Sequence, residues 1–205
     1  FFASVRTSTV ADPFVRYDRT SGRWFVSMID VSTPNRVLLA VSSGATITGA
    51  GSFTFFQFQH DLVGTTPNSD TGGFCDYLSM GVDANAVYLG GNIFNAAGTS
   101  FIGTTGYVVR KSSVTGGGPI VVTAFRQMAA SGGAGPFAPR GVDQTDPAAA
   151  EGYFIGVDNN VFSRLTIRRI STPGGTPTIS ANISVNVPTT VFPQNTPCLG
   201  STSPL

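Results

Sequence analysis

Lysine, glutamate, histidine and tryptophan each occur only once in this chain of 205 residues. Lysine and glutamate favour helices, so their scarcity disfavours a helical fold. Charged residues make up 11% of the chain, and the formal net charge is +1. A balance this close to neutral supplies no basic surface for nucleic acid or for an anionic membrane. We therefore expect no nucleic-acid partner.

The chain also lacks a long apolar run. No stretch approaches the roughly 20 residues needed to cross a bilayer, so we expect no membrane span. Residues 1–5 have neither the initiator methionine, the basic start nor the long apolar segment of a signal peptide. These first residues are expected to be the end of a strand whose beginning is missing.

Potential metal ligands are too few for a metal centre. His60, Cys75 and Cys198 cannot supply the usual four ligands of zinc. No Asp-x-Asp-x-Asp-Gly loop is present for calcium. We expect no metal and no cofactor. The two cysteines are compatible with an oxidising compartment, and the sequence leaves open whether they pair.

What the chain does contain favours strands and turns. Hydrophobic residues reach 41%, with 16 phenylalanines, while glycine and proline contribute 25 and 13 residues. Such a chain can build a core, and its valines, threonines and phenylalanines are typical of strands. A Gly-, Ser-, Thr- and Asn-rich composition with little Lys or Glu is common in secreted proteins. We therefore expect an extracellular location, secreted or at the cell surface.

One short unit recurs along the sequence. An apolar strand ends at an aspartate and a turn, and a second strand follows, at Asp18, Asp83 and Asp143, which lie 65 and 60 residues apart. Alternation and turn residues predict four strands around each turn. The predicted strands cover residues 14–17, 24–31, 36–42 and 52–59, then 77–82, 87–94, 106–112 and 120–128, then 137–142, 153–157, 163–171 and 178–187.

Self-similarity at a fixed period, with four strands in each repeat, predicts an all-β chain built from β-propeller blades. The blades span about residues 12–60, 76–128 and 137–187, with partial blades at 1–11 and 188–205. Closed propellers use roughly 4–8 blades, so three blades are expected to be part of a larger ring. The alternative is a β-sandwich, which also needs short alternating strands.

Two segments carry a family resemblance. Residues 12–18 with 21–25, and residues 76–88, resemble blade openings of secreted bacterial β-propeller repeat proteins of unassigned function. The resemblance covers most of residues 12–187 and implies a binding or structural module without known catalytic residues. The chain is also weakly similar to sialidase-type propellers. Asp18 lies four residues before Gly22, where the Asp-box of those enzymes has two, so that motif is not met.

Four residues are candidates for binding. Arg16 and Arg140 could hold acidic sugars through bidentate contacts, and Arg140 falls in a first strand, which lines the channel of a propeller. Asn68 and Asp70 stand at the tip of loop 60–74, which with loops 95–105 and 129–136 forms a possible contact surface. The expected partners are a protein or glycan at the cell surface, with further blades or other chains completing the fold.

No residue emerges as catalytic. His60 would have to serve any Ser-His-Asp triad, but no Gly-x-Ser-x-Gly motif supplies the serine. The turn aspartates Asp18, Asp83, Asp143 and Asp158 are expected to accept backbone N–H groups of their own turns. We therefore expect binding rather than catalysis. The alternative is a glycan-processing enzyme whose two carboxylates meet at the central channel.

Overall fold

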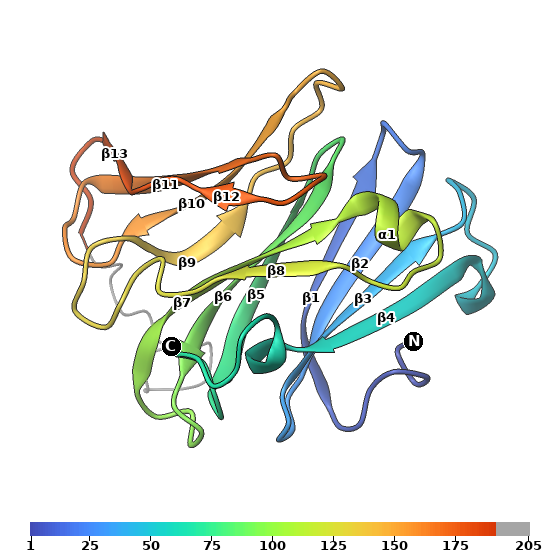
Figure 1. Cartoon of the computed structure of the whole chain (residues 1–205), viewed down its shortest axis with the longest axis horizontal. Coiled ribbons are helices and arrows are strands. Elements are labelled where there is room, and N and C mark those ends of the chain that lie inside the picture. Colours follow the sequence, from blue (N-terminus) through green and yellow to red (C-terminus); the bar gives the residue numbers. More distant parts are fainter. Residues whose placement is uncertain (192–205) are drawn as a thin grey trace, which may run out of the picture.

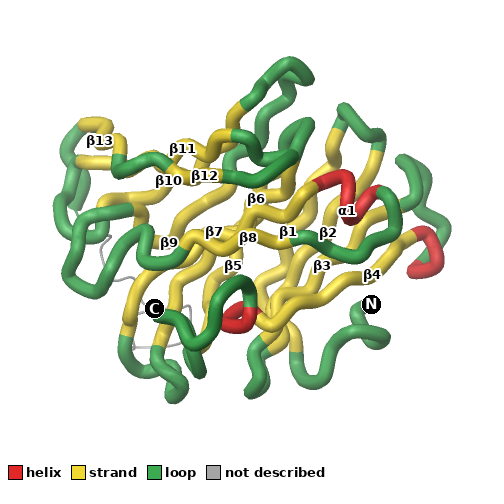
Figure 2. Tube along the Cα trace, in the orientation of Figure 1, coloured by secondary structure: helices red, strands yellow, loops and turns green. Residues whose placement is uncertain are grey.

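The computed structural model describes residues 1–191, and its regular structure is almost entirely strand. Three antiparallel sheets follow one another along the chain (Figures 1 and 2). The first contains β1 (Val10–Asp18), β2 (Arg23–Asp30), β3 (Arg36–Ser42) and β4 (Phe53–Gln59). The second contains β5 (Phe74–Val82), β6 (Ala86–Phe94), β7 (Phe101–Arg110) and β8 (Val122–Phe125). The third contains β9 (Pro136–Gly141), β10 (Glu151–Asp158), β11 (Arg164–Ser171), β12 (Thr178–Ile179) and β13 (Ile183–Asn186).

The all-β prediction is therefore confirmed. Helical structure in the described chain is limited to α1 (Lys111–Thr115) and the 3-10 turns η1 (Ala50–Ser52) and η2 (His60–Leu62). Three sheets are present rather than the two of a sandwich, and they do not close into a barrel. Each sheet has the strand order expected of a blade, with the first strand at one edge.

Most strand boundaries agree with the predicted ones, with four exceptions. Strand β1 begins at Val10, four residues before the predicted start. Strand β7 begins at Phe101, inside the segment 95–105 that was expected to be a loop. The end of the same predicted strand forms α1 instead. The last predicted strand, 178–187, is split into β12 and β13, which pair with different parts of β11.

The second sheet lies between the other two, and its two faces bury different cores (Figure 1). Against the first sheet it packs a large apolar cluster that includes Phe25, Leu39, Leu89 and Tyr107. Against the third sheet it packs a smaller cluster in which the rings of Tyr88 and Phe154 meet edge to face, 5.8 Å apart.

Glycines permit the close approach of the second and third sheets. A Cβ at Gly90 would lie 2.1 Å from the carbonyl oxygen of Pro139, and one at Gly81 would lie 2.3 Å from the carbonyl carbon of Gly141. Neither distance is compatible with a side chain. The backbones themselves therefore form this part of the interface.

The outer face of the first sheet is covered by residues 1–9, which form turns and not the strand expected there. Phe2 is fully buried, and its ring and that of Phe1 contact Phe55 of β4. The backbone of the segment folds back on itself, because Val5 and Arg6 both donate to the carbonyl of Phe2. The expected partial blade at 188–205 lies largely outside the described residues.

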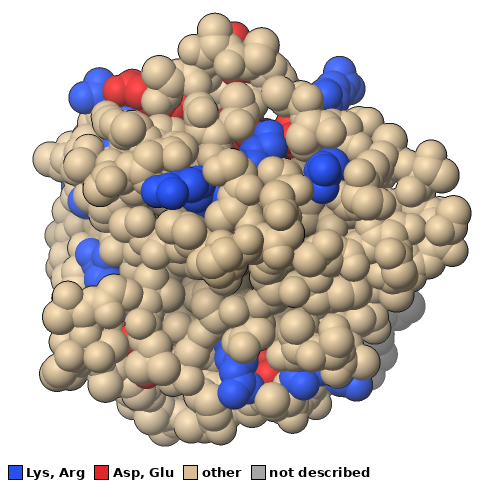
Figure 3. All heavy atoms as spheres, turned by 45° about the vertical axis from the view of Figure 1, so that its right-hand side comes forward, with Lys and Arg blue, Asp and Glu red and all other residues tan. Residues whose placement is uncertain are grey.

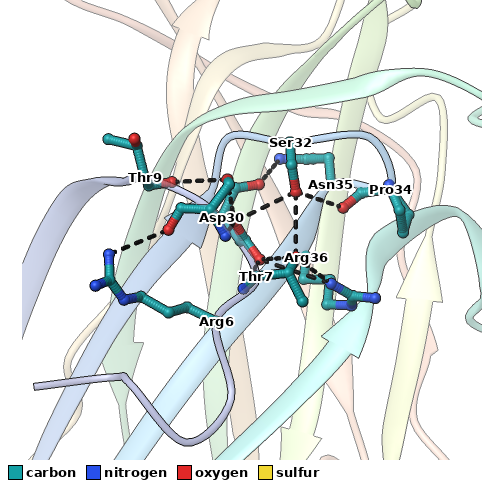
Figure 4. A network of polar contacts seen from close by, with 9 residues as sticks. Arg6, Thr7, Thr9, Asp30, Ser32, Pro34, Asn35 and Arg36 are labelled. Atoms are coloured by element: carbon teal, nitrogen blue, oxygen red, sulfur yellow. Dashed lines mark hydrogen bonds and ion pairs between the residues drawn. The ribbon is translucent and has the colours of Figure 1, made fainter.

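Asp30, at the end of β2, holds this segment in place (Figure 4). One carboxylate oxygen accepts hydrogen bonds from the backbone N–H and hydroxyl of Thr7, both at 2.8 Å, and the other accepts from the same groups of Ser8. Arg36 places a guanidinium nitrogen 3.7 Å from this carboxylate. Burial alone would raise the pKa of Asp30, but the hydrogen bonds from Ser8 and Thr7 outweigh it, and the pKa is lowered.

Candidate functional site

The first strands of the three sheets, β1, β5 and β9, lie side by side and are called the inner strands here. Each contains one non-glycine residue with a positive φ: Asp12 (54°), Tyr77 (54°) and Ala138 (45°). The pairing of each inner strand with its neighbour shifts register near that residue. A bulge of this kind bends a strand and turns a side chain away from the regular alternation. The three repeats therefore share a bulge at the same place in their first strands.

One chain of contacts links all three inner strands through Tyr77. The carboxylate of Asp12 on β1 accepts a hydrogen bond from the backbone N–H of Tyr77 on β5, at 3.1 Å. The guanidinium of Arg140 on β9 donates to the Tyr77 hydroxyl at 2.8 Å and lies 5.5 Å from the centre of its ring. This combination of a hydrogen bond and a cation–π contact fixes an exposed aromatic ring beside an exposed cation.

A second chain runs through Asp143, just after β9. Its Oδ2 accepts a hydrogen bond from the Nε of Arg16 on β1 at 2.8 Å, and its Oδ1 accepts from the backbone N–H of Val82 on β5 at 2.9 Å. Arg16 also donates to the carbonyl of Val15. Asp12, Arg16, Tyr77, Arg140 and Asp143 are called the inner-edge cluster below.

Asp143 corrects an expectation from the sequence. Asp18 is six positions after Asp12, and Asp83 is six positions after Tyr77, but Asp143 is only five positions after Ala138. Asp143 is thus one residue out of register with the other two repeats. A shift of one residue moves a side chain to the opposite face of a strand. Asp143 consequently binds other sheets and does not cap a turn.

The other turn aspartates behave as predicted. Asp18 accepts from the N–H groups of Thr20 and Ser21. Asp83 accepts from Asn85 and Ala86 in the same way, and Asp158 from Asn160 and Val161. These hydrogen bonds satisfy backbone donors inside each turn and are structural.

Lys111, the only lysine, joins two of these turns. It is buried at the start of α1, where its ammonium is ion-paired with Asp18 and donates to the carbonyl of Asp83. Burial alone would raise the pKa of Asp18, but hydrogen bonds from Lys111 and Ser21 outweigh it, and the pKa is lowered. The single lysine is therefore a buried residue that joins the first sheet to the second through its bonds to Asp18 and Asp83.

The two loop residues predicted to bind are placed differently from the inner-edge cluster. Asp70 is fully buried, accepts from the Thr105 hydroxyl at 2.7 Å and lies 3.1 Å from the Nε of Arg126. Asn68 donates to the carbonyls of Asp61 and Thr65 and holds its own loop. Both side chains stabilise the loop between β4 and β5. The structure brings neither of them to the two arginines.

His60 is buried between the first and second sheets. Its Nε2 lies 2.9 Å from the carbonyl of Gly73, so this nitrogen carries the proton, and its Nδ1 lies 3.4 Å from the Tyr107 hydroxyl. Burial, opposed by the Gly73 contact and nearby aspartates, lowers the pKa of His60. His60 therefore holds the carbonyl of Gly73 and the Tyr107 hydroxyl together inside the described structure.

Cys75 is also fully buried, and its thiol is hydrogen-bonded to Tyr107. Burial, and after it the negative charges of Asp70 and Asp76, raise the pKa of this thiol. Cys198, the other cysteine of the possible pair, lies outside the described residues. Within residues 1–191, no group of three or more His, Cys, Asp or Glu side chains could hold a metal ion.

Charged side chains are few and dispersed on the face drawn in Figure 3. In the described part of the chain, no helix is long and apolar enough to cross a membrane. Three members of the inner-edge cluster were not predicted from the sequence to bind: Asp12, Tyr77 and Asp143. The 65-residue repeat could have identified Tyr77, because that spacing places it opposite Asp12.

Searches for related proteins gave no match among family models, curated proteins or solved structures. The functional argument therefore depends on the geometry of this chain alone.

Proposed function

We propose that the three sheets are consecutive blades of a β-propeller arc, and that the chain is an extracellular binding or interaction module. The strongest support is the inner-edge cluster, which gathers exposed side chains from three segments about 60 residues apart in sequence. In a propeller the first strand of each blade faces the central channel, where ligands commonly bind. The composition supports the extracellular location.

The ligand class that fits this surface best is an acidic glycan. Tyr77 is 43% exposed and offers an aromatic ring. Among residues 1–191, the Arg140 guanidinium bonds only the Tyr77 hydroxyl, through one nitrogen. A ring that can lie against a sugar and a guanidinium that can bind a carboxylate together recognise a uronic acid. Asp143 already neutralises part of the charge of Arg16, so Arg140 is the main anchor.

The test is the affinity for oligogalacturonate immobilised on a biosensor surface, with neutral dextran as the reference. We expect binding of oligogalacturonate only, weakened at least tenfold by Tyr77→Ala and by Arg140→Ala. Tyr17→Ala is the matched control, because Tyr17 is 42% exposed on the opposite face of β1 and contacts Trp24. Equal affinity of Tyr77→Ala and wild type, or binding of neither glycan, would contradict the proposal.

A glycan-processing enzyme is the second candidate, and one observation favours it. Burial, and after it the nearby Asp76, raise the pKa of Asp12 at the same inner edge. Glycosidases use one carboxyl group with a raised pKa as the general acid and a second carboxylate beside the scissile bond. Against this role, one oxygen of Asp12 already accepts from the Tyr77 backbone. Release of reducing ends from oligogalacturonate by wild type, and its loss in Asp12→Asn and Asp76→Asn, would support the enzyme instead.

A further inference from the structure

The inner edge carries a second partly exposed cation, Arg16, besides Arg140. The guanidinium of Arg16 lies 5.8 Å from the centre of the Phe14 ring, and that of Arg140 lies 5.5 Å from the centre of the Tyr77 ring. Within residues 1–191 these are the two contacts of an arginine with the face of an aromatic ring, and both lie on the inner strands. The two arginines are therefore held in the same way.

The two arginines differ in their charge partners. Arg16 donates through Nε to Oδ2 of Asp143 at 2.8 Å, and through Nη1 to the carbonyl of Val15 at 3.0 Å. Arg140 donates to the Tyr77 hydroxyl, and no carboxylate of the described chain is ion-paired with it. The side chains of Arg16 and Asp143 are 36% and 47% exposed, so water reaches both. An ion pair this accessible is weak and can exchange one carboxylate for another.

Asp143 occupies only part of the Arg16 guanidinium. Its Oδ1 is held by the backbone N–H of Val82 at 2.9 Å, and its Oδ2 alone bonds Arg16. A carboxylate binds a guanidinium most strongly through two parallel hydrogen bonds, and Nε and Nη2 form one such edge. Within the described structure, Nη2 of Arg16 makes no hydrogen bond. A ligand carboxylate in the place of Oδ2 would thus gain a hydrogen bond that Asp143 does not make.

The two arginines are separated along β5. Arg140 bonds the side chain of Tyr77 at one end. At the other end, Asp143, the partner of Arg16, bonds the backbone of Val82. The five positions from Tyr77 to Val82 span at most about 16 Å of extended strand, and the bulge in β5 shortens that length. One sugar unit is shorter than this span, whereas a chain of several units reaches from one arginine to the other.

We propose that Arg16 is a second anion subsite for acidic glycans, and that Asp143 closes it in the free chain. The inference rests on the proposed glycan function and adds the length of the ligand to it. A uronic acid oligomer anchored at Arg140 reaches Arg16 with a second carboxylate and displaces Asp143 from the guanidinium. Because Asp143 stays bonded to Val82, its charge remains close and opposes the incoming carboxylate. Asp143 therefore limits the affinity that a longer glycan gains from its second contact.

The test is a calorimetric titration with digalacturonate, which is too short to reach both arginines, and with hexagalacturonate. The variant is Asp143→Asn, because its amide oxygen can accept from the Val82 N–H while its amide nitrogen, a donor, cannot pair with Arg16. We expect this variant to bind hexagalacturonate about tenfold more tightly than wild type, and digalacturonate within about twofold of wild type. Adding Arg16→Leu to Asp143→Asn should remove the gain.

Asp146→Asn is the matched control. It removes the same charge three positions further along the chain, and Asp146 is exposed and accepts from the Ala148 N–H within its own loop. Its affinity for hexagalacturonate should equal that of wild type, which excludes a general effect of net charge. Circular dichroism establishes that each variant is folded. In wild type, the side-chain Nε–H resonance of Arg16 should shift with hexagalacturonate and not with digalacturonate.

Three outcomes would overturn the second subsite and leave the site at Tyr77 and Arg140 intact. The first is an Asp143→Asn variant that binds hexagalacturonate no more tightly than wild type. The second is an equal gain for digalacturonate, and the third is a gain that survives Arg16→Leu. If Asp143→Asn does not fold, an unmoved Arg16 Nε–H resonance in wild type overturns the inference by itself. Binding of neither glycan by any folded form would contradict the proposed function, and this inference with it.

Discussion

Asp143, from the third sheet, is hydrogen-bonded to Arg16 of the first sheet, with 2.8 Å between Oδ2 and Nε, although the second sheet lies between these two sheets. The same carboxylate accepts from the backbone of Val82 in that second sheet. One side chain thus connects the inner strands of all three sheets. It does so beside the surface proposed to bind a glycan.

The ion pair is expected to contribute little to the free energy of unfolding, and substitution of Asp143 should cost more than substitution of Arg16. Arg16 and Asp143 are partly exposed, so Arg16→Leu should lower the free energy of unfolding by about 0.5 kcal/mol. Asp143→Ala should cost more, about 1–2 kcal/mol, because it also leaves the Val82 N–H without its acceptor. Urea unfolding of both variants and of the double variant measures the coupling. Arg19→Leu is the control, because Arg19 is exposed in the β1–β2 turn. If Arg16→Leu lowered the free energy of unfolding more than Asp143→Ala does, this account would be contradicted.

Asp30→Asn should release the amino-terminal segment. The amide keeps one acceptor oxygen but loses the charge, so the bonds from Thr7 and Ser8 weaken, at a cost of about 1–3 kcal/mol. Amides of residues 5–9 should then exchange with deuterium faster than in wild type, while those of β6 should not change. Unaltered exchange in residues 5–9 would show that the apolar contacts of Phe1 and Phe2 hold the segment without Asp30.

His60 should make stability depend on pH. Because the pKa of His60 is lowered in the folded chain from its ordinary value of 6.5, the unfolded chain takes up the proton first. The contribution of neutral His60 is therefore present above pH 6.5 and is lost as pH falls toward the folded pKa. The loss is about 1.4 kcal/mol for each unit by which the pKa is lowered.

His60→Gln should remove that dependence between pH 6.5 and pH 5, as measured by urea unfolding at several pH values. Both proteins should lose stability again as the pH falls below 3.8, because the unfolded chain then takes up protons at Asp30 and Asp158, whose pKa values are lowered in the folded chain. Parallel profiles for wild type and variant above pH 5 would show that His60 does not titrate as proposed.

The close contact of the second and third sheets predicts strong steric sensitivity. Gly90→Ala would place a Cβ 2.1 Å from the Pro139 carbonyl oxygen, so the sheets must separate, at a cost of about 3 kcal/mol or more. Gly44→Ala is the control, since no atom lies within 4 Å of its Cβ position and its φ is not positive. Thermal unfolding of both variants provides the measurement. Equal melting temperatures would mean that this interface is looser than described.

Much of the fold could be predicted from the sequence, and the reason is local. Strands and turns depend on residues that are close together in the sequence. The alternating apolar residues of β4 indicate a strand, and Asp18 and Asp83 indicate turns. The repeat of about 60 residues then predicted which strands belong to the same sheet. The off-register Asp143 was misread, because one missing residue between Ala138 and Asp143 is invisible until the bulges are located.

The candidate site was only partly predictable. Arg16 and Arg140 were named because a guanidinium can bind an acidic sugar, and Arg140 also because it falls in a first strand. Asn68 and Asp70 were named because they stand at a loop tip, and nothing in a loop sequence says that a carboxylate will be buried against Arg126. Contacts between distant segments, such as that of Arg140 with Tyr77, depend on how the sheets stack.

The most direct test of the central claim, that the inner edge binds an acidic glycan, is a titration of the isotope-labelled chain with trigalacturonate followed by amide chemical shifts. We expect the largest shifts at Tyr77, Arg140 and their neighbours on the inner strands, with smaller ones at Arg16. Shifts confined to loop 60–74 or to residues 129–136, or no shifts at millimolar ligand, would contradict the assignment of the site.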